Sequence, residues 1–133
     1  MDPRLILLVA MGGAVGSVAR FVLGSWAQQW SNRPDFPVGT LVVNVLGCFM
    51  IGILSELADA RSLITPEARA LLVVGFLGGL TTFSSFSNET LNLIRDGEHG
   101  LASLNLMLQL GLGLAAVWLG RWAVDLLERV IPS

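Results

Sequence analysis

The sequence has little charge, a single cysteine and a single histidine, and no tyrosine. Only 14% of its 133 residues are charged, against about 25% in soluble domains. A net charge of −2 excludes a basic surface for nucleic acid. One cysteine, Cys48, cannot form an intrachain disulfide, and without a cysteine–histidine cluster a structural zinc site is excluded. Because 53% of the residues are hydrophobic, the composition indicates a membrane protein.

Four long apolar blocks dominate the chain. They are separated by short polar connections, and Thr65-Pro66 in the second connection predicts a helix start. A helix crosses the hydrocarbon core with about 20 residues. We therefore predict an all-α membrane protein with four transmembrane helices in a single domain over residues 1–133. The blocks cover residues 5–27, 38–54, 71–86 and 101–124.

The arginines give only a weak orientation signal. Four spans place both termini and the middle connection on one side of the membrane. That side carries Arg4, Arg61, Arg69, Arg121 and Arg129, and the other carries Arg33, Arg95 and Arg20. Such a small bias orients a chain poorly under the positive-inside rule. The sequence is therefore compatible with two alternatives: a single topology in the membrane, or insertion in both orientations.

Two polar side chains interrupt the first two blocks. Arg20 continues the Gly12–Gly16 row at four-residue steps. This guanidinium either snorkels to the interface or lines an aqueous vestibule. Asn44 lies mid-span on the face of Thr40 and needs a hydrogen-bonding partner there. Asn44 has two possible roles: its amide could form a hydrogen bond to another helix, or it could donate an N–H into a conduit.

The third block contains a poor helix interior. Gly78-Gly79 followed by Thr81-Thr82 predicts a helix break at the two glycines. Backbone groups freed by such a break persist in a membrane only when they are buried in protein or face a cavity or an ion.

The residues after this break form two faces. Phe83 and Phe86 share one face, and Thr82, Ser85 and Glu89 share another. An aromatic stripe is usually core packing, but the positive edge of a ring can also accept a small anion. Glu89 is a carboxylate in or near the membrane and hence a functional candidate.

The fourth block adds a polar row and two of the four tryptophans. Asn105, Gln109 and Gly113 are spaced by four and share a face. The tryptophans lie near block ends and predict an interfacial belt. They are Trp26, Trp30, Trp118 and Trp122.

Three segments together resemble the Fluc (CrcB) family of fluoride channels. Residues 75–89 follow the pattern G-F-L-G-G-L-T-T-F-S-S-F-S-x-E, residues 39–44 read G-T-L-V-V-N, and residues 12–20 read G-G-x-x-G-x-x-x-R. The resemblance implies passive fluoride export by an antiparallel, dual-topology homodimer in the cell (inner) membrane. It implies fluoride and lipid as partners, no nucleic acid and no enzymatic activity.

The resemblance also assigns roles to particular residues. It implies a structural sodium ion (Na+) held at the dimer centre by the carbonyls of Gly78 and Thr81. Some relatives have a pore serine in the fourth span where this chain has Gly113, so Asn105 or Gln109 is expected to supply the donor instead. The implied fluoride pore residues are Asn44, Phe83, Phe86, Thr82, Ser85, Glu89, Thr40 and Arg20.

Two other functions compete with this interpretation. A small dual-topology drug/proton antiporter would need a membrane carboxylate that cycles between proton and cation, and Glu89 is the best candidate. A subunit that only packs against other proteins is the third possibility. It does not account for a helix break inside a membrane.

Overall fold

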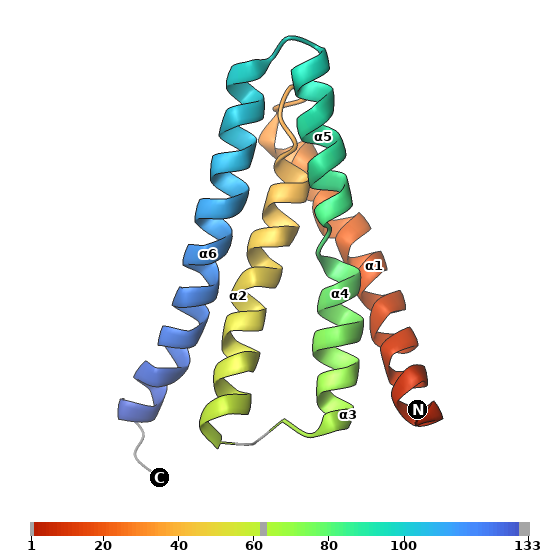
Figure 1. Ribbon diagram of the computed structural model, residues 1–133, viewed down its shortest axis with the longest axis vertical. Coiled ribbons are helices and arrows are strands. Elements are labelled where there is room, and N and C mark those ends of the chain that lie inside the picture. The colour runs from red at the N-terminus through yellow and green to blue at the C-terminus, as the bar shows by residue number, and fades with distance from the viewer. Residues whose placement is uncertain (1, 62–63, 131–133) are drawn as a thin grey trace.

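The computed structural model describes residues 2–61 and 64–130, and it is helical nearly throughout (Figure 1). Four of its segments are long and apolar enough to cross a membrane: Pro3–Ser31, Val38–Ala58, Pro66–Arg95 and His99–Leu127. The predicted four spans are thus confirmed, and the third extends well beyond its apolar block. The helices are α1 (Pro3–Ser31), α2 (Val38–Arg61), α3 (Pro66–Ala68), η1 (Arg69–Leu77), α4 (Gly78–Leu80), α5 (Phe83–Arg95) and α6 (His99–Val130).

The four spans run alternately up and down. The ends of α1 and α6 that lead to the termini lie at one end of the molecule, together with the end of α2 and the start of α3 (Figure 1). The opposite end holds the loop from α1 to α2 and the turn from α5 to α6. Thr65 begins the third span, because its Oγ1 accepts a hydrogen bond of 3.2 Å from the Ala68 N–H and Pro66 occupies the first turn. The helix start predicted at Thr65-Pro66 is confirmed.

Glycines let α1 lie directly against the first half of the third span. A methyl group at Gly12 would overlap the Leu71 carbonyl oxygen, and one at Gly16 would overlap the Phe76 carbonyl oxygen. Both contacts lie on η1, a π-helix over Arg69–Leu77. Small residues at such a crossing allow backbones to approach closely inside a membrane.

The third span is interrupted, but the prediction of a break at Gly78-Gly79 is wrong. Both glycines are helical within α4, which ends at Leu80. The extended residues are Thr81 (φ −86°, ψ 157°) and Thr82 (φ −152°, ψ 117°). Gly79 serves packing instead, since a side chain there would meet the backbone of Gly13 on α1.

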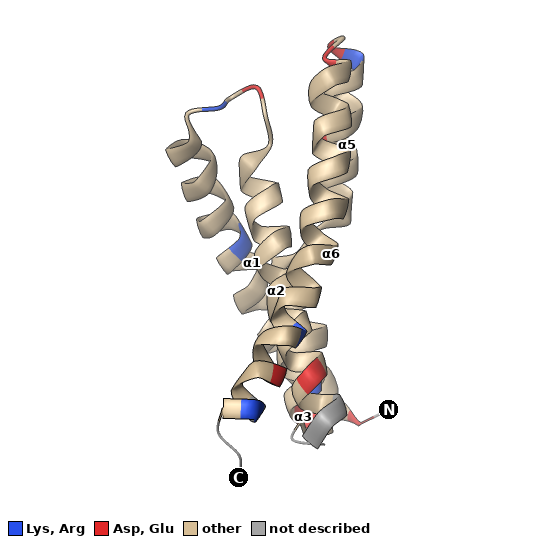
Figure 2. Cartoon of the chain, turned by 90° about the vertical axis from the view of Figure 1, so that its left-hand side faces the viewer, with Lys and Arg blue, Asp and Glu red and all other residues tan. Residues whose placement is uncertain are grey.

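The end with the two loops splits into two arms (Figure 2). One arm holds the end of α1 and the start of α2, and the other is the α5–α6 hairpin. The amide of Gln28 fixes the loop of the first arm. Its Nε2 donates to the carbonyls of Arg33 (2.7 Å) and Phe36 (3.0 Å), and its Oε1 accepts from the Gly39 N–H (3.0 Å).

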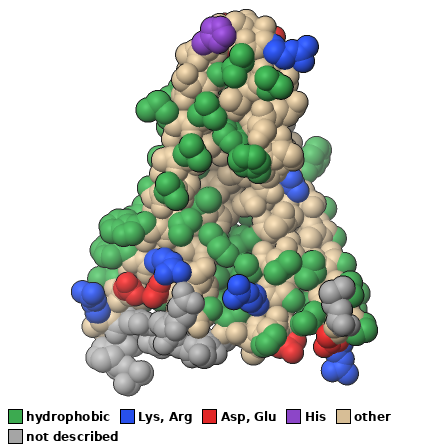
Figure 3. Space-filling view, viewed as in Figure 1, with side chains coloured by type: hydrophobic (Ala, Val, Ile, Leu, Met, Phe, Trp, Pro, Cys, Tyr) green, Lys and Arg blue, Asp and Glu red, His purple; other side chains and the backbone are tan. Residues whose placement is uncertain are grey.

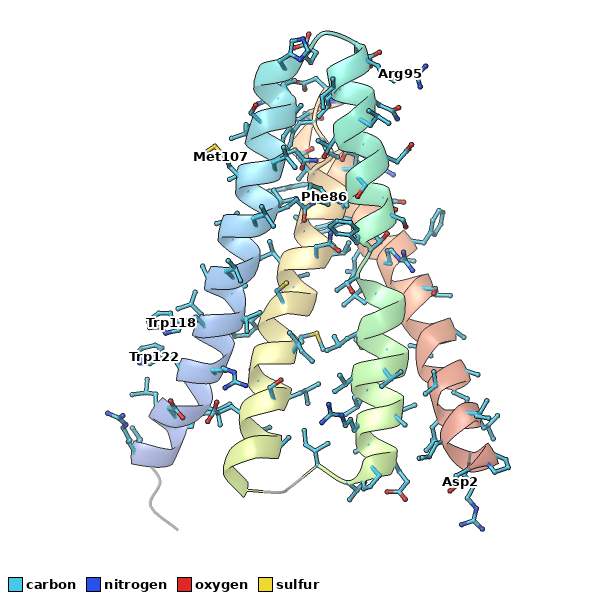
Figure 4. All side chains as sticks on the ribbon, viewed as in Figure 1. Asp2, Phe86, Arg95, Met107, Trp118 and Trp122 are labelled. Atoms are coloured by element: carbon cyan, nitrogen blue, oxygen red, sulfur yellow. The ribbon has the colours of Figure 1, made fainter. Side chains whose placement is uncertain are left out.

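The outer surface suits a lipid environment. Hydrophobic side chains spread along the length of the face in Figure 3, and charged side chains lie mostly toward the two ends. Trp118 and Trp122 point away from the bundle (Figure 4) and stack at 6.4 Å, as Trp26 and Trp30 do at 6.3 Å. The interfacial role of these tryptophans stays a prediction.

Candidate functional site

The extended backbone of Thr82 is held by Asn44 on α2. The Thr82 N–H donates to Asn44 Oδ1 at 2.8 Å, and Asn44 Nδ2 donates to the Thr82 carbonyl at 3.0 Å. A continuous helix would send this N–H to the Gly78 carbonyl. The hydrogen bond to Asn44 Oδ1 therefore replaces the helical hydrogen bond that the Thr82 N–H loses at the break. Together the two hydrogen bonds with Asn44 connect the second span to the third.

The Thr82 side chain restarts the third span. Its Oγ1 accepts a hydrogen bond of 3.1 Å from the Ser85 N–H and lies 3.0 Å from Ser85 Oγ. This is the N-cap geometry that threonine favours. Consequently the Ser85 N–H, which a continuous helix would give to the Thr81 carbonyl, is also used elsewhere. The carbonyls of Gly78 and Thr81, the predicted sodium ligands, have thus both lost their regular helical donor.

A second amide extends the network from Asn44 to α6. The remaining N–H of Asn44 donates to Gln109 Oε1 at 3.1 Å. Gln109 Nε2 is buried and has no hydrogen-bond partner among the described residues. The sequence identified Gln109 only as one of two possible donors in the fourth span.

Asn105, the other fourth-span amide, is fully buried between α5 and α6. Its Nδ2 donates to Thr90 Oγ1 at 2.9 Å, and Thr90 donates to the Phe86 carbonyl at 2.8 Å. Asn105 thus joins the helices of the hairpin. Gly113 lies against α2, where an added Cβ would be 3.5 Å from Cys48 Sγ.

Five of the eight predicted pore residues line one cavity, which we call the track cavity. It has a volume of about 530 Å³ and lies between the two arms. In it, Thr40 Oγ1 donates to Glu89 Oε1 at 2.6 Å. The five residues are Arg20, Thr40, Thr82, Ser85 and Glu89.

The two phenylalanines face a different cavity, the ring cavity, of about 430 Å³. Their ring centroids are 5.5 Å apart and the planes meet at 64°, an edge-to-face arrangement. Phe86 is 6% exposed and points into the bundle in Figure 4, whereas Phe83 is 77% exposed. Asn44 and Gln109 line this cavity as well, together with Gly78 and Thr81.

The structure thus separates the predicted residues onto the two faces that their spacing predicts. Thr82 belongs to both cavities and forms the wall between them. The rings and amides lie on one side of that wall, and the hydroxyls, Arg20 and Glu89 lie on the other. Whether an ion contacts these residues stays a prediction.

Sequence reasoning missed Gln28, which lines the track cavity and fixes its loop. The available signal was an amide at the end of a span, directly before a proline-rich connection. In that connection Arg33 donates two hydrogen bonds of 3.0 Å to the Asp35 carboxylate. These bonds lower the pKa of Asp35 below its usual value.

Four apolar helices around a line of amides, hydroxyls and rings define a small multi-pass membrane protein with a polar interior. The chain belongs to the family described as "CrcB-like protein, Camphor Resistance (CrcB)", which matches residues 7–121. The membership predicted from the three sequence segments is confirmed.

Similar proteins share most of their length with this chain. A "Fluoride-specific ion channel FluC" of Rhizobium etli is 47% identical over 114 residues, which cover 86% of this chain and 90% of the relative. Proteins with the same name from Methylobacillus flagellatus and Opitutus terrae are 44% and 51% identical. These alignments cover 86% and 90% of this chain, and 90% and 91% of the relatives.

Proposed function

We propose that this protein is a fluoride-selective channel that lets fluoride leave the cell passively. The names of relatives at 44–51% identity support the permeant ion. Fluoride enters a cell as neutral HF and ionises inside, so a passive path for the anion relieves its accumulation. A channel changes no covalent bond, and no enzymatic step belongs to this function.

One observation carries the mechanism: the ring cavity and the track cavity meet at Thr82. An ion enters a filter when fixed groups replace its hydration shell. The hydroxyls of Thr40 and Ser85 supply polar groups on one side of Thr82. The edges of Phe83 and Phe86 supply a positive rim on the other.

The working unit in this proposal is an antiparallel homodimer that inserts in both orientations. The exposed ring of Phe83 supports it, because a 77% exposed aromatic at the functional site is available to a second copy. The near balance of arginines between the two sides supports the dual orientation. The cell (inner) membrane is the proposed location.

A structural sodium ion at the dimer centre completes the proposal. The carbonyls of Gly78 and Thr81 fit this role, because the N–H groups that a helix would send them are taken by Asn44 and Thr82. Two such oxygens from each subunit make a set of four without a carboxylate. Oxygen-only ligands suit a hard cation. The bound cation would supply a fixed positive charge that lowers the energy of nearby anions.

Proteoliposomes loaded with potassium fluoride test the function. A fluoride electrode follows efflux after a potassium ionophore is added, with no pH gradient imposed. We expect rapid fluoride release and little chloride release from matched vesicles. Efflux no faster than from protein-free vesicles, with monodisperse protein, would overturn the proposal.

A drug/proton antiporter is the second candidate, and the geometry of Glu89 is the observation that favours it. Its Oε2 is buried without a partner among the described residues, as in a carboxyl that exchanges a proton for a cation. The efflux assay separates the two functions. Channel flux persists without a proton gradient, whereas antiport requires one.

A further inference from the structure

A small cavity lies between α2, η1 and α6, at the end of the bundle that leads to the termini. Its volume is about 160 Å³, well below the roughly 300–1,000 Å³ of sites for drug-sized ligands. Two arginines from different helices line it, Arg69 on η1 and Arg121 on α6, together with Ser55 on α2. The other wall residues are apolar and include Ile51, Leu54 and Val73. We call this cavity the arginine cleft.

Arg69 lies where a helix does not favour a positive charge. It directly follows α3 at the start of the third span, which Thr65 caps. The N-terminal end of a helix carries a partial positive charge that favours anions. Glu67, the acidic residue of the first turn, is exposed and does not line the cleft. Among the described residues the Arg69 guanidinium makes no ion pair. An anion in the cleft would compensate both the guanidinium and the helix end.

Arg121 is oriented by a glutamate on α2. Its Nη1 lies 3.3 Å from Glu56 Oε2. A guanidinium carries five N–H donors, more than one carboxylate accepts, so this ion pair orients the arginine without excluding a second anion. The two arginines and Glu56 together keep a net positive charge beside the cleft. Phosphate suits such a pair, because the planar fork of arginine binds two of its oxygens at once.

The depth of the cleft in the membrane is indicated by two tryptophans. Trp118 and Trp122 flank Arg121 on α6, are 64% and 50% exposed, and point away from the bundle in Figure 4. Exposed tryptophans near the end of a span are typical of the headgroup level. Toward the middle of the bundle, Ile51 and Val73 line the arginine cleft and the ring cavity alike. The cleft therefore combines charge at headgroup depth with apolar walls below it, in the order in which a lipid presents phosphate and hydrocarbon.

We propose that the arginine cleft binds the phosphodiester headgroup of an anionic phospholipid. Arg69 and Arg121 contact the phosphate, Ser55 is a further donor, and the apolar wall receives the start of an acyl chain. Basic pockets between transmembrane helices are typical sites for anionic headgroups. A soluble phosphate would gain nothing from the apolar wall, so the surface favours the lipid. The proposal depends on insertion into a membrane and is independent of the ion that the protein conducts.

Lipid binding is measured on the full chain in dodecyl maltoside by native mass spectrometry. Phosphatidylglycerol and phosphatidylcholine are titrated separately, and inorganic phosphate is added as a competitor. Arg69→Gln removes one guanidinium. The double variant Arg121→Gln with Glu56→Gln removes the other without leaving its carboxylate unpaired. Arg129→Gln, in the last turn of α6 and outside the cleft, is the matched control for charge alone.

We expect the wild type to bind phosphatidylglycerol more tightly than phosphatidylcholine, because choline brings a positive charge toward the arginines. Arg69→Gln and the double variant should each weaken phosphatidylglycerol binding at least about tenfold, the cost of one hydrogen bond to a charged group. Arg69→Lys should fall between, since an ammonium keeps the charge and loses the fork. Arg129→Gln should match the wild type, and inorganic phosphate should not displace the lipid.

The contrary outcomes each overturn the proposal. Unchanged affinity in Arg69→Gln would remove the site, and an equal loss in Arg129→Gln would reduce it to general surface charge. Equal binding of the two lipids would show that the cleft does not distinguish headgroup charge. Displacement by inorganic phosphate would assign the arginines to a soluble anion. The thermal unfolding midpoint without lipid is recorded for every variant. If Arg69→Gln does not fold, Arg69→Lys decides, because wild-type affinity there would exclude the two-pronged contact.

Discussion

Thr40 on α2 donates a 2.6 Å hydrogen bond to the Glu89 carboxylate on α5. The bond joins the second span to the part of the third span that follows the break. Only Oε1 of Glu89 takes part, and Oε2 is buried without a partner among the described residues. The carboxylate is thus anchored through one oxygen, which an amide at the same position would also provide.

The Glu89→Gln variant should retain fluoride flux. Gln keeps an oxygen for Thr40 and removes a negative charge from the wall of the track cavity, which favours an anion. Efflux with and without a pH gradient is the measurement, with Thr40→Val as the companion variant that breaks the bond from the other side. An antiporter that uses this carboxyl predicts the opposite, a complete loss of transport in Glu89→Gln.

Replacement of either phenylalanine by isoleucine should reduce fluoride flux. Phe86 is buried, so its variant should also lower stability by about 1–3 kcal/mol, as shape changes in a core do. Phe83 is 77% exposed in the subunit and should cost little stability. Flux and thermal unfolding are compared for both, with Leu91→Ile, on the same helix and 54% exposed, as the control.

Phe83→Ile decides between the two roles of the aromatic pair. A ring that only fills space predicts normal flux in this variant. Reduced flux in a protein of wild-type stability would require the ring edge itself.

An alanine at Gly16 should destabilise the subunit. Its methyl group would overlap the Phe76 carbonyl, and overpacking of this kind costs about 1–3 kcal/mol. Gly111→Ala is the matched control on α6, where an added Cβ meets no atom within 4 Å. Alanine there should raise helix stability by up to about 1 kcal/mol. Thermal unfolding in detergent measures both, and equal stabilities would contradict the close crossing of α1 and η1.

Removal of sodium should reduce fluoride flux. The ligands proposed on Gly78 and Thr81 are backbone carbonyls, so no side-chain substitution deletes them directly. Prolonged exchange into N-methylglucamine, a cation too large for a four-oxygen cage, is the accessible test, and return of sodium should restore the flux. Unchanged flux after exhaustive exchange would contradict a structural role for the ion.

Both orientations of the protein should occur in the membrane in comparable amounts. The arginine bias is small, so little energy separates the two insertions. Reporter fusions at the C-terminus measure the sidedness. Two or three arginines added to the turn between α5 and α6 should shift the population to one orientation. A native fusion found on one side only would contradict the antiparallel dimer.

The four spans were predictable because they depend on composition. A membrane core demands about 20 apolar residues per helix, and polar connections mark the ends. The two faces after the break followed from helical spacing, which places Phe83 and Phe86 apart from Ser85 and Glu89. The family was likewise visible in three short segments, and the match over residues 7–121 confirms it.

The position of the break was decided by tertiary structure. Local propensity favours Gly78-Gly79, because glycine weakens a helix. Yet Gly79 is needed at the crossing with α1, and the break lies at Thr81-Thr82, where Asn44 captures both backbone groups of Thr82. That amide is 38 residues away in the chain, and no local rule registers a partner at such a distance.

The roles of the amides were decided in the same way. Spacing shows that Asn44 and Gln109 lie inside the membrane, and lipid requires that they find partners. It does not show that the two meet, nor which end of the Gln109 amide has no hydrogen-bond partner among the described residues. The sequence determined which polar groups enter the membrane, and the packing of α2, α5 and α6 decided which of them bind each other and which N–H has no partner among the described residues.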